Sequence, residues 1–164
     1  SVEIVPMVQR EGAPVSSSRI RACLEAGDVE TAGAYLLERY AGETHEIVYE
    51  LCLDRKGKLL ACKRLNDGGA SSAALDIRKV VENAILTSAS TVILAHNHPT
   101  GPALPSATDQ LTTLKIMQLL APAGISILDH IIVAGENACS MADRGRLPDI
   151  SAHPGILNAA STDF

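Results

Sequence analysis

Short apolar runs bounded by turn residues predict four strands in the middle of the chain. HEIVYELCLD (45–54) and KLLACKRL (58–65) flank a DRKG segment, whose turn chemistry favours a β-hairpin. TVILA (91–95) is wholly apolar, so we expect a central strand that is buried on both faces. ISILDHIIVA (125–134) predicts a further strand.

Two segments with helical periodicity alternate with these strands. SSAALDIRKVVENAIL (71–86) predicts a helix whose apolar stripe consists of Ile77, Val80, Val81 and Ala84. A second helix is expected to begin near Ser106 and to end at Pro122 and Gly124. Its inward-facing residues are expected to be Leu111, Leu114, Met117 and Leu120. The alternation predicts an α/β fold, in which helices pack on a mixed sheet.

The chain divides into three parts. Residues 1–42 form a helical leader with two capped helical signals, and we interpret it as a lead-in or as the remnant of an upstream domain. Residues 43–147 form the compact domain. Residues 148–164 contain prolines and small polar side chains, which predicts a loosely ordered tail.

Composition excludes several classes of protein. The 164 residues are 46% hydrophobic and 20% charged, which is typical of one folded domain. Aromatic residues are only 2%, which argues against a stacking platform for single-stranded nucleic acid. A net charge of -5 disfavours direct binding to duplex DNA. The longest apolar runs are too short for a membrane span. Four cysteines without CxxC pairing and a chain start unlike a secretory signal favour a cytoplasmic protein with reduced thiols.

The segment VILAHNHPTGPALPSATDQL carries the chemistry. His96 and His98 follow a buried strand, and residues two apart on an extended chain point to the same side. Asp109, in the first turn of the next helix, can reach back towards them. Two imidazoles and one carboxylate leave a fourth position open, which is typical of catalytic zinc. Zinc lowers the pKa of its bound water to about 7, and the Ser106 hydroxyl is a candidate oxyanion donor.

Ser106 and Asp109 also fit a purely structural role. A serine at the N-cap followed by an acidic residue in the first turn is typical of a helix N-terminus. The two roles are compatible, because a capped helix holds the aspartate in place.

HNHPTG followed by PSATD resembles the metal signature of the JAMM/MPN+ metalloprotease superfamily, which is HxH, ten residues and Asp, with Ser three residues before the Asp. Together with DHIIVA, the match resembles the bacterial RadC-like branch over about residues 43–142. Thr100 departs from this pattern, since the branch usually has Ser there. The resemblance implies a JAB/MPN-like fold of cytidine-deaminase-like architecture, a Zn²⁺ cofactor with His96, His98 and Asp109 as ligands, and Ser106 as the oxyanion donor.

The superfamily also uses a glutamate from an early strand as general acid and base. Glu46 and Glu50 lie on the same face of the first predicted strand, so the two-residue period leaves both open. In RadC-like proteins the glutamate lies eight residues before the aspartate that closes the strand. Asp54 closes the strand here, so the resemblance selects Glu46, and Glu50 is expected to be a solvated or edge-facing charge.

Other candidates are weaker. His130 lies inside an apolar strand, so we expect a core histidine or a neighbour of the metal ligands. His45 points away from Glu46 and is expected to be exposed. Cys139 is expected to be packed instead of nucleophilic.

The leader resembles a different family. Its APVSSSRIRACLEAGDVETAGAYLL segment is similar to part of the nucleotidyltransferase domain of FAD synthetases. The nucleotide-binding His motif of that domain is missing, so its activity is not carried over.

The sequence therefore predicts a zinc-dependent hydrolase that cleaves an amide bond in a peptide or isopeptide substrate. Two alternatives remain open at this point. One is a module associated with nucleic acid and DNA repair, as implied by the RadC resemblance, and the other is a metal-binding partner module without catalysis.

Overall fold

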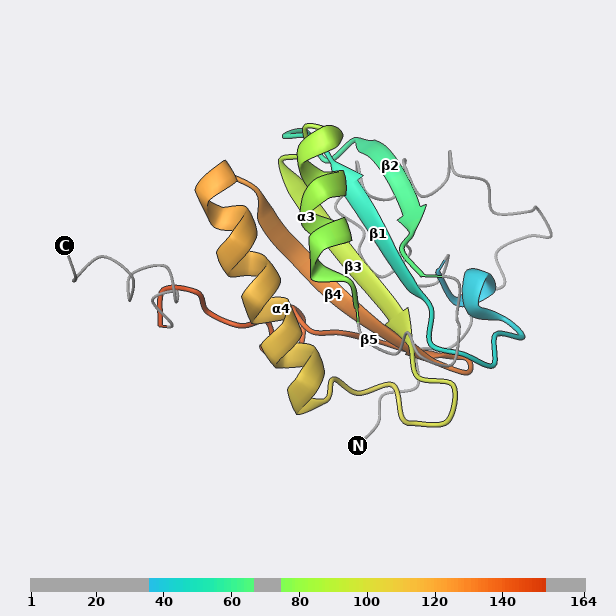
Figure 1. Ribbon diagram of the computed structural model, residues 1–164. Helices are drawn as coiled ribbons and strands as arrows, with labels where there is room; N and C mark the ends of the chain where they lie inside the picture. The colour runs from blue at the N-terminus through green and yellow to red at the C-terminus, as the bar shows by residue number, and fades with distance from the viewer. Residues whose placement is uncertain (1–35, 67–74, 153–164) are drawn as a thin grey trace.

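Five strands form one mixed sheet in the computed structural model, which describes residues 36–66 and 75–152 (Figure 1). The strands are β1 (Val48–Leu53), β2 (Leu59–Arg64), β3 (Thr91–Asn97), β4 (Ser126–Ala134) and β5 (Asn137–Ser140). Their order across the sheet is β2-β1-β3-β4-β5. Only the β3–β4 pair is parallel among these strands; the other pairs are antiparallel. The predicted α/β fold with a mixed sheet is confirmed.

The predicted hairpin is present between β1 and β2. The Asp54 carboxylate accepts hydrogen bonds from the backbone N–H groups of Lys56 and Lys58. Gly57 has a φ of 78°, which a glycine adopts without the steric cost of a Cβ. The turn residues therefore fix the register with which β2 joins the sheet.

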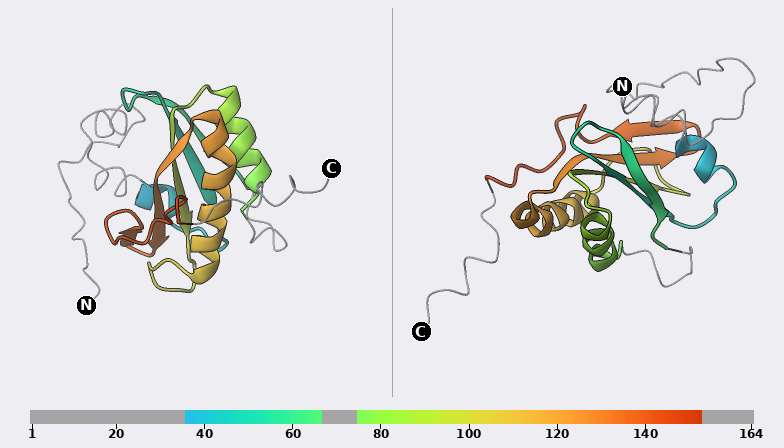
Figure 2. Two further views of the ribbon diagram at one scale, coloured as in Figure 1. Left: turned by 90° about the vertical axis from the view of Figure 1, so that its left-hand side faces the viewer. Right: turned by 90° about the horizontal axis from the view of Figure 1, so that it is seen from above.

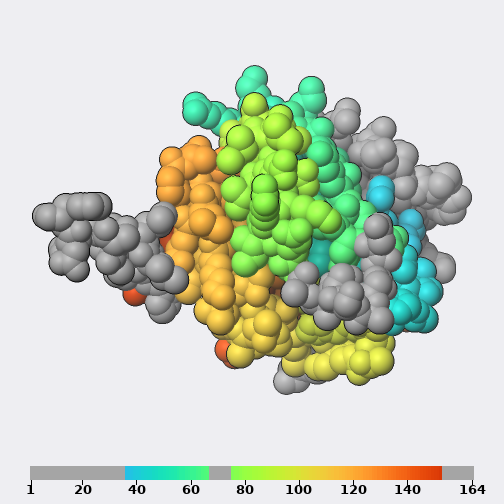
Figure 3. Space-filling view, viewed as in Figure 1, coloured from blue at the N-terminus to red at the C-terminus, as the bar shows by residue number. Residues whose placement is uncertain are grey.

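Two helices, α3 (Ile77–Leu86) and α4 (Ala107–Leu120), cover one face of the sheet and lie side by side (Figures 2 and 3). The Asp76 side chain caps α3 by accepting from the Lys79 N–H. The predicted stripe of α3 is confirmed, because Val80 and Ala84 are buried and Ile77 and Val81 pack against the same cluster. Residues 71–74, where we expected this helix to begin, lie outside the described residues.

The inward face of α4 agrees with the prediction in part. Leu120 is buried and Met117 packs against the core, as expected. Leu111, however, is 52% exposed, and Thr113 and Ile116 are buried on the inward face. The true stripe is rotated because the helix is anchored at Asp109 and Thr113, one turn apart, which face the site at the end of β3. The contacts of Asp109 and Thr113 with the site thus decide which apolar residues of α4 face the core.

β3 is the central strand and is buried on both faces, as predicted. Even-numbered residues such as Val92 and Leu94 pack under the two helices, and odd-numbered residues such as Ile93 pack on the opposite face. The strand is longer than the TVILA run, since it continues to Asn97. His96 is therefore part of the strand and does not lie beyond it.

The second face of the sheet is covered by residues before β1. Residues 36–40 are helical, and Leu36 and Tyr40 join the cluster of buried residues on that face. The remainder of the predicted leader helices and most of the predicted tail fall in residues 1–35 and 153–164, outside the described residues. Within the described ranges, no helix has the length and apolar character needed to cross a membrane.

Candidate metal centre

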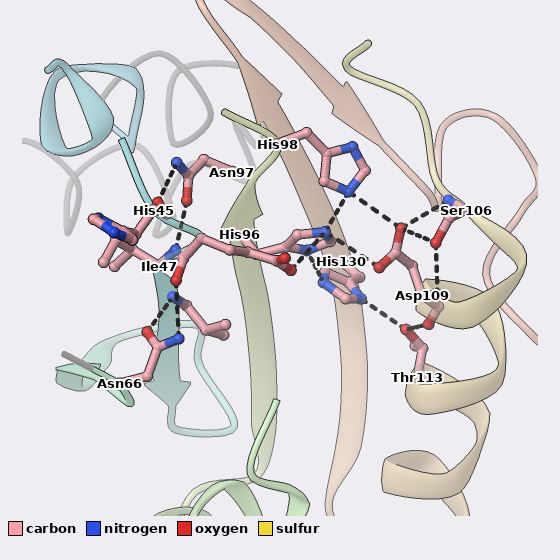
Figure 4. Close-up of polar contacts among 12 residues, drawn as sticks. His45, Ile47, Asn66, His96, Asn97, His98, Ser106, Asp109, Thr113 and His130 are labelled. Atoms are coloured by element: carbon pink, nitrogen blue, oxygen red, sulfur yellow. Dashed lines mark hydrogen bonds and ion pairs between the residues drawn. The ribbon is translucent and has the colours of Figure 1, made fainter. Parts of the chain in front are cut away.

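The C-terminal end of β3 and the N-terminal turn of α4 bring three candidate ligands together (Figure 4). His96 is the penultimate residue of β3, His98 follows the strand, and Asp109 lies in the first turn of α4. The two Nε2 atoms are 2.9 Å apart. Asp109 Oδ1 lies 3.2 Å from His96 Nε2, and Asp109 Oδ2 lies 3.5 Å from His98 Nε2. The structure thus places all three predicted metal residues in one cluster.

These distances suit a small divalent cation. Ligand atoms at 2.0–2.1 Å from a tetrahedral zinc ion lie about 3.3 Å from one another. The two Nε2 atoms are 2.9 Å apart, and the separations of 3.2 and 3.5 Å join them to the two different oxygens of Asp109, so all three values lie close to this distance. His96 is 3% exposed and Asp109 13% exposed, so little solvent competes for the ligands. The donor set therefore fits a metal ion with an open position towards solvent.

The ring of His98 is oriented by the loop that follows it. His98 Nδ1 lies 3.0 Å from the carbonyl oxygen of Pro102. A carbonyl only accepts hydrogen bonds, so Nδ1 carries the proton and donates. Nε2 of His98, which faces His96 and Asp109, is then the ring nitrogen left for a metal ion.

Ser106 holds Asp109 in place. The Ser106 Oγ accepts from the Asp109 N–H at 3.1 Å, while the Ser106 N–H and hydroxyl both donate to Asp109 Oδ2 at 2.7 Å. These bonds form a capping box at the start of α4, so Ser106 and Asp109 do cap the helix. The hydroxyl proton points at the carboxylate, and Ser106 lines the groove from that position.

The charge state of Asp109 suits a ligand. Burial raises the pKa of its carboxyl, but hydrogen bonds from His96 and Ser106, together with the charge of His96, outweigh burial and hold the pKa well below its usual range. Asp109 is therefore an anion across the physiological pH range.

Glu46 approaches the same cluster from the segment before β1. Its Oε1 lies 3.9 Å from His96 Nε2, and its side chain is 31% exposed. Glu46 lines a groove of about 320 Å³ together with the three candidate ligands. Glu46 thus lies beside the candidate ligands and is open to the groove.

Two asparagines that the sequence reasoning missed fix the backbone around Glu46. Asn97 Oδ1 accepts from the Ile47 N–H at 2.6 Å, and its Nδ2 donates to the His45 carbonyl at 3.0 Å. Asn66 Nδ2 donates to the Glu46 carbonyl at 3.0 Å. Alternation along β3 puts Asn97 on the face opposite His96, where it is buried. A buried amide needs hydrogen-bond partners, and this is the one feature of the sequence that could have pointed to its role.

Glu50 is not the solvated or edge-facing charge that we expected. It is fully buried under α3, because β1 lies inside the sheet and not at its edge. Its Oε2 accepts from Asn83 Nδ2 at 3.1 Å, while Oε1 is buried without a hydrogen-bond partner. Burial raises the pKa of Glu50 to about 7 against the lowering effect of Asn83. Glu50 is not among the residues that line the groove.

His130 occupies the layer behind His96. It is 2% exposed, its Nε2 lies 2.8 Å from His96 Nδ1, and its Nδ1 lies 2.7 Å from Thr113 Oγ1. Burial lowers the pKa of His130 to about 3, and the nearby His96 adds to this effect. It is thus a neutral residue in contact with a candidate ligand, at the position expected for a neighbour of the metal ligands.

The remaining candidates lie away from the cluster. His45 is exposed, as predicted. Cys139 is 2% exposed, and burial raises the pKa of its thiol, which fits a packed side chain. Burial likewise raises the pKa of Cys52 to about 11.

Part of the groove wall is less polar than the ligand cluster. It consists of Val48 from β1, Leu75 and Ile77 at the start of α3, and Thr108 and Thr112 on α4. None of these five side chains carries a charge. The groove thus joins an uncharged wall to an anionic, imidazole-rich floor.

Fold and site together define an α/β domain with a His–His–Asp group that could hold a metal ion at the end of its central strand. A family profile for the RadC-like JAB domain matches residues 27–146. This match covers most of the chain, and the chain belongs to the RadC-like JAB domain family.

Curated relatives agree with this assignment. A UPF0758 protein of Stenotrophomonas maltophilia (strain R551-3) is 40% identical over 115 residues, covering 70% of this chain and 49% of the relative. A UPF0758 protein of Pseudoalteromonas translucida is 42% identical over 111 residues, covering 68% of this chain and 50% of the relative. The chain thus spans about half the length of these relatives.

Proposed function

We propose that this domain is a zinc-dependent hydrolase that cleaves an amide bond, in a peptide or an isopeptide linkage, with an activated water. The observation that carries the proposal is the convergence of His96 Nε2, His98 Nε2 and an Asp109 carboxylate oxygen, with Glu46 Oε1 3.9 Å from His96 Nε2. Membership of the RadC-like JAB family supports the same chemistry.

The ligand residues supply a ready site for the cation. The negative charge of Asp109 and the orientation of His98 by Pro102 are in place without rearrangement. A zinc ion held by His96, His98 and Asp109 would supply a Lewis acid, which would lower the pKa of water in the site to about 7.

Glu46 is placed to move protons. A carboxylate at the groove surface accepts a proton from the attacking water and delivers it to the nitrogen of the leaving amine. The hydrogen bonds from the Ile47 N–H to Asn97 Oδ1 and from Asn66 Nδ2 to the Glu46 carbonyl hold the backbone that carries this carboxylate. Ser106 is proposed to donate a hydrogen bond from its hydroxyl to the developing oxyanion, which requires the hydroxyl to rotate away from Asp109 Oδ2.

The uncharged wall of the groove bears on the substrate. Val48, Leu75 and Ile77 form an apolar surface next to the ligands, and this favours an uncharged side chain beside the scissile bond. We propose that the substrate is a peptide or a protein. We also propose that this protein is located in the cytoplasm.

The test compares Glu46→Gln with Glu82→Gln, a matched change at an exposed position of α3. Both variants and the wild type are loaded with zinc and assayed against fluorogenic peptides and peptides joined through a lysine side-chain amide. Glu46→Gln is expected to keep about one zinc per chain and to lose at least 100-fold in kcat, while Glu82→Gln is unchanged. Equal turnover by wild type and Glu46→Gln would contradict the proposal. Zinc binding without turnover in any of the three proteins would favour the metal-binding partner module.

A further inference from the structure

We propose that Thr113 and His130 are positioning residues that decide which ring nitrogen of His96 is free to bind a metal. They form a buried chain, Asp109 carbonyl–Thr113–His130–His96, that runs from α4 through β4 to the end of β3 (Figure 4). The inference rests on the proposed metal site, since it concerns a ligand of that site.

The donor and acceptor of each hydrogen bond in this series can be assigned, starting from Thr113 on α4. Thr113 Oγ1 lies 2.6 Å from the backbone carbonyl of Asp109. A carbonyl has no proton to give, so the threonine hydroxyl must donate its only hydrogen there. Towards His130 Nδ1, 2.7 Å away, the same oxygen therefore accepts, and the proton of that contact sits on His130 Nδ1.

The next link follows from the neutrality of His130. This side chain is 2% exposed, and its two ring nitrogens contact a hydroxyl and an imidazole, neither of which is a carboxylate. A neutral imidazole carries one proton, which is already on Nδ1, so Nε2 is an acceptor. His96 Nδ1, 2.8 Å away, must then donate to it.

The reverse arrangement conflicts with the distances. If His130 carried its proton on Nε2, the Thr113 hydroxyl would have to donate to His130 Nδ1. Thr113 Oγ1 and the Asp109 carbonyl oxygen would then face each other at 2.6 Å with no proton between them. Two acceptors at that separation repel each other, so the first arrangement is the stable one.

The consequence reaches the metal site. Because Nδ1 of His96 is committed to His130, Nε2 is the ring nitrogen left for a metal ion, and it lies beside His98 Nε2 and Asp109. The Pro102 carbonyl does the same for His98. One helix-borne hydroxyl and one loop carbonyl thus engage Nδ1 of both rings and leave both Nε2 atoms directed at the same point, where a cation would bind.

The experiment maps ring protons in the metal-free chain of 164 residues. Long-range ¹H–¹⁵N correlations on histidine-labelled protein show which nitrogen of His130 carries hydrogen. In the wild type we expect the proton on Nδ1. Thr113→Val keeps the shape and removes the acceptor, so the Nε2–H form of His130 should appear. Thr113→Ser keeps the hydroxyl and is expected to restore the wild-type pattern.

A second readout uses zinc alone. Competition with a chromophoric chelator measures its affinity, and we expect Thr113→Val to bind about tenfold more weakly than the wild type or Thr113→Ser. A wild-type His130 protonated on Nε2 would overturn the inference, even if Thr113→Val does not fold. So would a Thr113→Val protein with the wild-type proton pattern and zinc affinity. A wild type that binds no zinc would refute the proposed function. It would not affect this inference, because the position of the ring proton of His130 is measured without metal.

Discussion

Asn97 and Ile47 are joined by a 2.6 Å hydrogen bond from the Ile47 N–H to Asn97 Oδ1. This bond connects the residue between the two candidate histidine ligands to the residue that follows Glu46. One amide side chain on β3 therefore sets the distance between the proposed general base and the metal ligands.

Replacing Asn97 with Ala should uncouple the two halves of the site. The variant leaves the Ile47 N–H and the His45 carbonyl without their side-chain partner, which should cost about 1–3 kcal/mol of unfolding free energy. We expect kcat to fall while zinc content stays at the wild-type level, because His96 and His98 have separate supports. Denaturant unfolding and zinc analysis, with Asn137→Ala on β5 as the control, check this. Wild-type stability and turnover in Asn97→Ala would contradict it.

Ser106→Ala removes the hydroxyl that caps α4. It also reduces the hydrogen-bond donors to Asp109 Oδ2 from two to one, because only the backbone N–H remains. The loss of an N-cap hydroxyl is expected to lower the free energy of unfolding by about 1 kcal/mol. Zinc affinity should fall as well, because Asp109 Oδ2 loses its hydrogen bond from the hydroxyl. Ser106→Thr keeps a capping hydroxyl and should recover both properties. If Ser106→Ala and Ser106→Thr behave alike, the hydroxyl is not what orients Asp109.

The buried Glu50 makes stability depend on pH. Its pKa is raised by burial from 4.5 to about 7, so the folded protein holds this proton more tightly than the unfolded chain. That contribution is complete below about pH 4.5 and is lost as the pH rises through about 7.

Glu50→Gln is neutral at every pH and should remove this dependence. We expect it to be more stable than the wild type at pH 8.5, by on the order of 2 kcal/mol, and nearly equal to it at pH 4.5. Urea unfolding at both pH values measures the difference, with the exposed Glu82→Gln as the control. A constant offset between Glu50→Gln and wild type across this range would show that the carboxyl does not titrate as the structure implies.

Sequence patterns predicted the parts of the fold that depend on neighbouring residues. The apolar TVILA run gave the central strand, and the DRKG turn gave the hairpin, because alternation and turn chemistry act over a few residues. The ligand spacing was readable for the same reason. His96 and His98 share a strand end, and Asp109 sits in the first turn of the next helix.

The features that depend on distant segments were not predictable in the same way. Leu111 is exposed because α4 turns Asp109 and Thr113 towards β3 and β4, and helical periodicity alone does not show where those strands lie. Glu50 is buried because β1 is flanked by β2 and β3, which a single strand pattern cannot reveal. Asn66 meets the segment before β1 only after the hairpin has formed.

The central claim is that His96, His98 and Asp109 hold one zinc ion. Elemental analysis of the wild type and His98→Ala, purified in parallel without a chelator, tests it most directly. We predict about one zinc per wild-type chain, and none in His98→Ala with its fold intact. A folded wild type without zinc, or a His98→Ala protein that keeps its zinc, would contradict the account.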